Sequence, residues 1–303
     1  MGKTLPTKFL DARILRSISD AELRARLLVQ GMYASRHRCP YYGYSVEFVD
    51  HREYTNGDEP RTIDWKMFAR TDRYYVKRFE MESNMNVLCM FDVSGSMGYK
   101  SADTSRLTKL EYGSYLLAAL CHLVSHQQDA PGLVTFDQDV REFIPPRQGK
   151  RHLFTILSRF ESLEGKSGTQ IHAVLRTVAQ RFKRRGIVVM MSDCNTDEDQ
   201  VMDGVRLLRA QGHDVILMHL LDSDEVEFPF SALTAFRDME TGRQIISDPL
   251  RLRKGYLDRF KKFRDRIQTD CVAAGVDYRF ISTKDPIELV LRDYLLYRRE
   301  RSR

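Results

Sequence analysis

Apolar and polar positions alternate with different periods in different parts of this chain. Residues 8–35 have apolar side chains at helical spacing, and residues 44–80 show the shorter period of β structure with an Asn56-Gly57 hairpin signal. Within the β-rich stretch we expect the single tryptophan, Trp65, to pack in the core. This part of the chain therefore predicts a helix followed by a β-rich accessory segment.

From Asn86 onward, apolar runs alternate with amphipathic segments. The runs Val87–Phe91 and Ile187–Met191 are wholly apolar, as expected of strands covered on both faces of a parallel sheet. Thr108 and Glu111 have capping-box spacing, which predicts the start of a helix. The expected strands are 87–91, 132–136, 140–144 (antiparallel to the strand before it), 187–191, 214–221 and 278–281, and the expected helices are about 108–127, 150–162, 170–184, 199–210, 252–271 and 286–299. This alternation predicts an open, mostly parallel, doubly wound α/β sheet.

These patterns predict two domains. Residues 1–83 form the helical and β-rich accessory segment, and residues 84–303 form the α/β domain. An insertion rich in turns and aromatic side chains interrupts the second domain at about 223–248. A long basic helix then carries an apolar stripe, which consists of Leu252, Tyr256, Phe260, Phe263, Ile267 and Cys271.

The composition is typical of an ordinary soluble protein, with 42% hydrophobic and 30% charged residues among 303. No apolar run approaches the roughly 18 residues of a membrane span, and the first residues lack the apolar region of a secretory signal. The five cysteines contain no Cys-x-x-Cys pair, which argues against a disulfide scaffold or a zinc ribbon. We therefore expect a cytoplasmic protein with no membrane span.

The net charge of +6 is unevenly distributed. Residues 1–40 have 8 basic and 3 acidic side chains, and residues 251–303 have 15 and 8, so the middle of the chain is acidic overall. Basic ends can indicate an anionic partner. These basic residues lie in mixed-charge helices with no recognisable nucleic-acid-reading motif, so nucleic acid is not the expected partner. Because the helix over 251–267 is basic, association with nucleic acid is a third possible function of the protein.

Oxygen-bearing side chains follow the predicted strands where ligands bind in open α/β sheets. Asp92, Ser94 and Ser96 come directly after the first buried strand, Thr169 precedes the helix near 170–184, and Asp193 follows the strand 187–191. Because the carboxyl ends of parallel strands meet at one edge of the sheet, we expect these loops to lie together. Asp92 and Ser94 could alternatively act as caps of the helix that follows.

Hydroxyl and carboxylate oxygens without His or Cys suit a hard cation, here Mg²⁺ with Mn²⁺ or Ca²⁺ as substitutes. If Asp92 and Asp193 act largely through water while hydroxyls bind directly, the ion keeps enough positive charge to attract a carboxylate from outside. Such a site is a docking point rather than a reaction centre. His122, His172 and His219 have no metal-ligand spacing and are expected to be structural.

The pattern Asp-x-Ser-x-Ser, with a distant Thr and a later strand-end Asp, resembles the metal-ion-dependent adhesion site of von Willebrand factor A domains. A more specific block resembles the bacterial family called domain of unknown function 58, and it consists of Glu47-Phe48, Arg52-Glu53-Tyr54, Gly57-Asp58, Arg61, Ile63-Asp64-Trp65, Ala69-Arg70 and Val76-Lys77. The likeness continues through Phe228-Pro229-Phe230, Phe236-Arg237-Asp238, Glu240-Thr241-Gly242 and Asp277-Tyr278, so it covers almost the whole chain.

This resemblance implies that Ser94, Ser96 and Thr169 are direct or near-direct metal ligands and that Asp92 and Asp193 act through water or from behind the ligands. It also implies a partner, a MoxR-type AAA+ ATPase or its client protein, bound through an acidic side chain. The expected function is that of a non-enzymatic adaptor or assembly factor. The alternative is a Mg²⁺-dependent phosphoester hydrolase, which needs a general base. The sequence offers none beyond Asp193 and the acidic run 197–199.

Overall fold

A computed structural model describes residues 46–55, 61, 63–81, 85–101, 103, 106–165, 168, 170–240 and 242–301. These residues belong to two compact units, one within His37–Asn84 and the other from Met85 onward. The predicted helix over 8–35 and the predicted Asn56-Gly57 hairpin turn lie outside the described residues. Among the described residues, no helix combines the length and the apolar character that crossing a membrane requires.

The smaller unit contains an antiparallel strand pair and a short helix. Strand β1 (Val46–Glu53) pairs with β2 (Tyr75–Met81), with a register shift between Phe48 and Asp50. Helix α2 (Trp65–Thr71) begins after Asp64, whose carboxylate accepts from two backbone N–H groups of the first turn at 3.0 and 3.3 Å. Such an N-cap satisfies donors that a helix start otherwise leaves unpaired.

The structure corrects two expectations about Trp65. The segment is not β structure at this point, because Trp65 is the first residue of α2. Between β1 and α2, the only β pairing formed by the described residues is an isolated β-bridge from Ile63 to Val76. Trp65 is also not a core residue, since 60% of it is exposed. The hydrogen bonds of the Asp64 cap stabilise the start of a helix here, although tryptophan favours β structure. The ring instead lies edge-on to Phe68 and Tyr74, at centroid distances of 6.1 and 6.4 Å.

The larger unit is built on a six-stranded sheet in the order β10-β7-β6-β3-β4-β5. All neighbouring strands are parallel except β5, which is antiparallel to β4. The strands are β3 (Asn86–Asp92), β4 (Ala130–Phe136), β5 (Val140–Ile144), β6 (Ile187–Ser192), β7 (Asp214–Leu221) and β10 (Asp277–Ser282). This arrangement confirms the predicted open, mostly parallel α/β sheet, including the antiparallel partner at 140–144.

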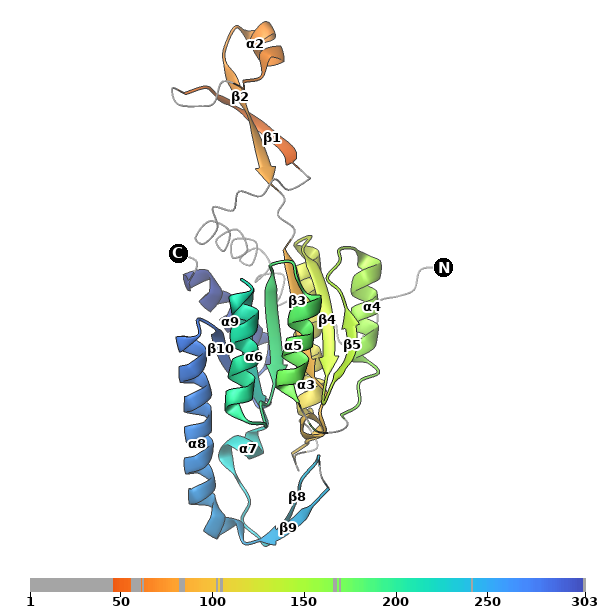
Figure 1. The fold of residues 1–303 in the computed structure, drawn as a ribbon, viewed down its shortest axis with the longest axis vertical. Coiled ribbons are helices and arrows are strands. Elements are labelled where there is room, and N and C mark those ends of the chain that lie inside the picture. The colour runs from red at the N-terminus through yellow and green to blue at the C-terminus, as the bar shows by residue number, and fades with distance from the viewer. Residues whose placement is uncertain are drawn as a thin grey trace. The chain divides into compact units, whose positions relative to one another are not determined.

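Helices cover both faces of the sheet (Figure 1). Along β3, Val87, Cys89 and Phe91 face one layer, whereas Leu88 and Met90 face the other. The first layer contains α3 (Lys109–His126), α4 (Lys150–Phe160) and α9 (Ile287–Arg301), and the second contains α5 (Ile171–Arg181), α6 (Glu198–Ala210) and α8 (Pro249–Ala273). Burial on both sides explains why this strand is apolar throughout, since each large apolar side chain buried contributes about 1.5–3 kcal/mol.

The predicted apolar stripe on the long basic helix is fully buried only near its carboxyl end. Ile267 and Cys271 are inaccessible, but Leu252 is 41% exposed. Figure 1 shows the reason, because the first turns of α8 extend past the carboxyl ends of the strands. There the helix meets the insertion, and the Tyr256 and Phe228 rings lie 4.5 Å apart.

The insertion at about 223–248 contains a short helix and a hairpin at the carboxyl edge of the sheet (Figure 1). Helix α7 (Ser223–Glu227) directly follows β7, and strands β8 (Thr234–Arg237) and β9 (Gln244–Ser247) pair as an antiparallel hairpin. Phe236 of β8 lies 5.7 Å from Phe228 and 5.3 Å from Phe230, measured between ring centroids. This aromatic cluster attaches the hairpin to α8.

Candidate functional site

The predicted ligands Asp92, Ser94, Ser96 and Asp193 lie together at the carboxyl edge of the sheet. Asp92 ends β3, and the chain then turns into the 3-10 helix η3 (Gly95–Gly98) that contains Ser96. Asp193 follows the last residue of β6, which pairs with β3 in parallel, so both loops leave the sheet at the same edge. Thr169, the fifth predicted ligand, lies outside the described residues.

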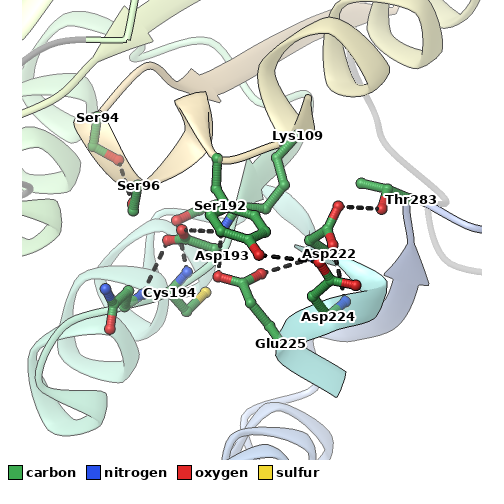
Figure 2. A network of polar contacts seen from close by, with 12 residues as sticks. Ser94, Ser96, Lys109, Ser192, Asp193, Cys194, Asp222, Asp224, Glu225 and Thr283 are labelled. Carbon is green, nitrogen blue, oxygen red and sulfur yellow. Dashed lines mark hydrogen bonds and ion pairs between the residues drawn. The ribbon is translucent and has the colours of Figure 1, made fainter. Parts of the chain in front are cut away.

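The two serine hydroxyls have the spacing of neighbouring ligands of one small cation. Ser94 Oγ and Ser96 Oγ are 3.0 Å apart, and both side chains are buried (Figure 2). In an octahedral Mg²⁺ site with ligands at about 2.1 Å, adjacent oxygens lie about 3.0 Å apart. The hydroxyl pair therefore fits one edge of such an octahedron.

The helix-cap alternative does not account for Ser94. Ser94 occupies the cap position of η3, but its hydroxyl makes no capping hydrogen bond. Its backbone N–H donates to Asp92 Oδ1 at 2.9 Å. The Ser94 side chain is thus left to interact with Ser96, and the Asp92 carboxylate orients the loop that carries both hydroxyls.

Asp92 is a fully buried carboxylate beside a second one. Its Oδ2 accepts from the Ser192 hydroxyl at 2.6 Å. Burial, reinforced by the nearby charge of Asp193, raises the pKa of Asp92 to about 7 even though hydrogen bonds from Ser192 and Ser94 oppose the shift. Two such carboxylates at one edge favour the binding of a cation, because a cation stabilises their ionised forms.

Asp193 is held by contacts on both its side chain and its backbone. Its Oδ1 accepts from the Asn195 N–H at 3.1 Å, and the Ser96 hydroxyl lies within hydrogen-bonding reach of its carboxylate. The His219 Nε2–H donates to the Asp193 carbonyl at 2.9 Å, which leaves Nδ1 of the neutral ring to accept from the Tyr278 hydroxyl at 2.9 Å. Burial lowers the pKa of His219 to about 4. His219 is therefore a structural histidine that positions the Asp193 loop.

Lys109 is a site residue that sequence reasoning missed. Its side chain is wholly buried, with Nζ 2.8 Å from Asp193 Oδ2 and 2.7 Å from Glu225 Oε1 (Figure 2). Burial by itself would lower the pKa of Lys109, but the two carboxylates outweigh it and raise the pKa above its ordinary value. One signal was present in the sequence: a lysine in the first turn of a helix is unfavourably placed in the helix dipole, so it needs a local anion.

Helix α7 fixes the second partner of Lys109. Glu225 and Asp222 form a capping box, in which Glu225 Oε2 accepts from the Asp222 N–H at 2.7 Å. The Asp222 carboxylate itself accepts from the hydroxyl of Thr283, the residue just after β10, at 2.8 Å. Lys109 thus connects α3, the loop after β6 and α7 in one buried cluster of charges.

Glu240 is a second residue that the predicted ligand set did not include. It lies between β8 and β9, and the Ser96 hydroxyl is within hydrogen-bonding reach of its carboxylate. Burial, followed by repulsion from Asp193, raises the pKa of Glu240. The insertion therefore brings a third carboxylate to the loops of Ser96 and Asp193.

Serine hydroxyls and carboxylates are the oxygen donors that the described residues bring to this edge. Among the described residues, no three or more His, Cys, Asp and Glu side chains are grouped as a metal-binding cluster. The described cysteines Cys89, Cys121, Cys194 and Cys271 are buried free thiols. The donors that remain are hard oxygens, which is the chemistry that Mg²⁺ prefers.

Several known proteins are similar to this chain. Uncharacterised proteins of Mycobacterium tuberculosis and Mycobacterium bovis are 23% identical over 244 residues, which cover 79% of this chain and 75% of each relative. Among solved structures, an aerotolerance-related membrane protein from Bacteroides fragilis is 17% identical, with a TM-score of 0.49 over 72% of this chain and 99% of that one.

Two further solved structures resemble the chain more distantly. The conserved hypothetical protein BatB from Bacteroides thetaiotaomicron is 15% identical, with a TM-score of 0.48 over 71% of this chain and 99% of that one. The SpRpn10 VWA domain is 11% identical, with a TM-score of 0.40 over 69% of this chain and 94% of that one.

A family match covers most of the larger unit and part of the smaller one. It extends over residues 50–266, which is more than half of the chain. The matched segment includes β3, η3, β6, α7 and the β8–β9 hairpin, and so it contains the five predicted ligands together with Lys109, Glu225 and Glu240. The chain belongs to the family described as protein of unknown function DUF58.

Proposed function

We propose that this protein is a non-enzymatic interaction module that binds a partner through a divalent ion. Mg²⁺, or Mn²⁺ in its place, would be coordinated by Ser94, Ser96 and Thr169. Asp92 and Asp193 would contact the ion through water or support the coordinating residues without touching the ion. When bound, the ion supplies a Lewis acid with a free coordination position. An acidic side chain of the partner would take that position.

The observation that carries this proposal is the 3.0 Å separation of the Ser94 and Ser96 hydroxyls beside two buried carboxylates. Lys109 adds a second argument. Its ammonium group pairs with Asp193, so part of the negative charge at the site is neutralised before any ion binds. An ion held by neutral hydroxyls and a partly compensated carboxylate keeps a strong attraction for an external anion.

The proposed partner is a MoxR-type AAA+ ATPase or the client of that ATPase, with this protein as adaptor or assembly factor. The proposal rests on the family resemblance of the block from Glu47 to Lys77. We also propose that this activity is located in the cytoplasm.

A Mg²⁺-dependent phosphoester hydrolase is the alternative. It needs a general base beside the ion, but the acidic residues that the sequence suggested for this role form ion pairs with basic side chains. Asp193 is paired with Lys109, while Glu198 and Asp199 each lie 2.7 Å from a nitrogen of Arg266. The same pairs neutralise part of the basic helix α8, which weakens the argument for nucleic-acid binding.

The test uses the full chain immobilised and exposed to an extract of its own cells, with Mg²⁺ or with excess chelator. We expect capture of an AAA+ ATPase or its client only with Mg²⁺, and loss of that capture in Ser94→Ala. Ser162→Ala is the matched control, because Ser162 is exposed and its hydroxyl donates to the carbonyl of Arg159 in its own helix end, away from the predicted ligands. Equal capture in chelator would overturn the metal bridge.

A second assay separates the two functional classes. Calorimetry with Mn²⁺ should show binding by the wild type and at least tenfold weaker binding by Ser94→Ala. Mg²⁺-dependent cleavage of a generic phosphodiester, lost in Asp193→Asn or Glu240→Gln, would instead favour the hydrolase.

A further inference from the structure

The turn between β8 and β9 holds Glu240 by backbone and side-chain bonds. The Asp238 N–H donates to the Arg243 carbonyl at 2.8 Å, and the Gly242 N–H donates to the Asp238 carbonyl at 2.9 Å. The Asp238 carboxylate accepts from the Glu240 N–H at 2.8 Å. These bonds do not use the Glu240 side chain, so the turn leaves its carboxylate available for another contact.

That carboxylate approaches two of the loops that supply predicted ligands. The Ser96 hydroxyl is within its hydrogen-bonding reach. Its Oε2 lies 3.0 Å from the position that a Cβ atom would take on Gly168, the residue before Thr169 in the sequence. A side chain at 168 would crowd the carboxylate, so glycine there permits this close approach.

The contacts made by Glu240 leave part of its carboxylate unsatisfied. Ser96 has one hydroxyl proton and lies within reach of both the Asp193 and the Glu240 carboxylates, so it can donate to only one of them. Glu240 Oε1 is buried and has no hydrogen-bond partner among the described residues. Leaving a buried acceptor unsatisfied costs about 1–3 kcal/mol, and more for a charged group. A divalent ion at Ser96 would satisfy both carboxylates.

We propose that Glu240 occupies, from within the same chain, the coordination position that a partner's carboxylate would otherwise take. This inference rests on the metal site of the proposed function and adds its regulation. The β8–β9 hairpin is then an internal competitor, and a partner binds the ion only by displacing Glu240. An acidic side chain is the appropriate competitor, because it has the same chemistry as the ligand that it excludes.

The hairpin is built so that displacement has a low cost. Ile245 and Ile246 of β9 are already 69% and 70% exposed, so moving this strand removes little apolar surface from its present packing. Its attachment to the domain comes from Phe236 of β8, in the aromatic cluster with Phe228 and Phe230. Movement about this cluster would withdraw Glu240 while the sheet stays intact.

The experiment measures Mn²⁺ binding by the full chain in wild type, Glu240→Ala and Glu161→Ala. Glu161 is an exposed residue at the end of α4, so its variant controls for the loss of one negative charge. We expect Glu240→Ala to bind Mn²⁺ about tenfold more weakly, since affinity follows the number of charged ligands. Water-proton relaxation should show one more exchanging water on the bound Mn²⁺ in Glu240→Ala, with no change in Glu161→Ala.

Acetate provides a second readout of the vacated position. In Glu240→Ala, added acetate should remove the additional water, whereas in the wild type it should leave the hydration of Mn²⁺ unchanged. Mn²⁺ should also slow amide exchange in the turn 238–243 of the wild type but not of Glu240→Gln.

Two results would overturn the inference, and they differ from each other. Wild type and Glu240→Ala with equal Mn²⁺ affinity and equal hydration would refute the role of Glu240 and leave the metal site standing. A wild type that binds no Mn²⁺ would refute the metal site and this inference together.

Discussion

Lys109 Nζ lies 2.8 Å from Asp193 Oδ2, and the lysine side chain is fully buried. The two residues are 84 positions apart, at the start of α3 and just after β6. A buried ion pair is costly to desolvate, so its presence at the carboxyl edge of the sheet calls for a specific role. We assign it the role of placing Asp193 and of neutralising part of its charge.

Replacement of Lys109 by methionine should strongly destabilise the protein. It leaves Asp193 and Glu225 buried without their cation, and breaking a buried pair in this way costs about 3–5 kcal/mol. Denaturant unfolding measures the loss. Lys284→Met is the matched control, because Lys284 pairs with Glu227 at 2.8 Å on the exposed surface and should have little effect. Equal stability of the two variants would contradict this role of Lys109.

The same substitution should strengthen metal binding. Without the ammonium group, Asp193 regains its full charge and the repulsion between Lys109 and an incoming ion disappears. We expect Lys109→Met to bind Mn²⁺ about tenfold more tightly than the wild type, measured by calorimetry under folded conditions. Weaker binding would show that Lys109 organises the ligands instead of opposing the ion.

Gly113→Ala should destabilise the protein although alanine favours helices. A Cβ on Gly113 of α3 would lie 2.6 Å from Phe91 Cε2 and 2.8 Å from Met191 Sδ, where the helix rests on β3 and β6. Overpacking of this kind costs about 1–3 kcal/mol. In Gly255→Ala on α8, where the new Cβ meets nothing within 4 Å, stability should instead rise by about 0.5–1 kcal/mol. Thermal or denaturant unfolding of both variants tests this, and a stabilising Gly113→Ala would contradict the close packing of α3.

Asp129 should make stability depend on pH. Its Oδ1 accepts from the Met85 N–H at 2.8 Å, and burial raises its pKa to about 6 despite that bond. A carboxyl whose pKa is higher in the folded state than in the unfolded state stabilises the fold when protonated, and this stabilisation is lost as the pH rises through about 6.

The Asp129→Asn variant isolates this effect from other titrating groups. It keeps an acceptor for the Met85 N–H but does not titrate. The unfolding free energy of the variant minus that of the wild type should increase by about 1 kcal/mol between pH 5 and pH 7.5. A difference that stays constant over this range would refute the raised pKa.

Asp64→Ala should loosen the smaller unit locally. It removes the carboxylate that caps α2 and that lies 2.9 Å from His51 Nε2, and loss of an N-cap costs about 1 kcal/mol. Hydrogen exchange of the amides at Trp65–Thr71 is the appropriate measurement, since it reports this helix separately from the larger unit. Unchanged protection of these amides would show that tertiary contacts, and not the cap, hold α2.

Features that depend on near neighbours were predictable along the chain. The capping box of Thr108 and Glu111 is present, with both reciprocal hydrogen bonds formed. The apolar runs became strands buried on both faces, and the parallel order of β3 and β6 brought Asp92 and Asp193 to one edge. Strand periodicity and helix caps depend on residues a few positions apart, so they can be predicted from residue patterns. The meeting of strand ends at one edge follows from the parallel topology, which the same patterns predict.

The charges around the site were decided by long-range packing. Glu225 pairs with Lys109 across 116 positions, and Glu240 reaches Ser96 only because the insertion folds back over the edge of the sheet. Trp65 lies at the surface because a cap started a helix where a strand was expected. Burial and the meeting of distant elements determine which charges are paired, and neither quantity can be obtained from the spacing of residues along one segment.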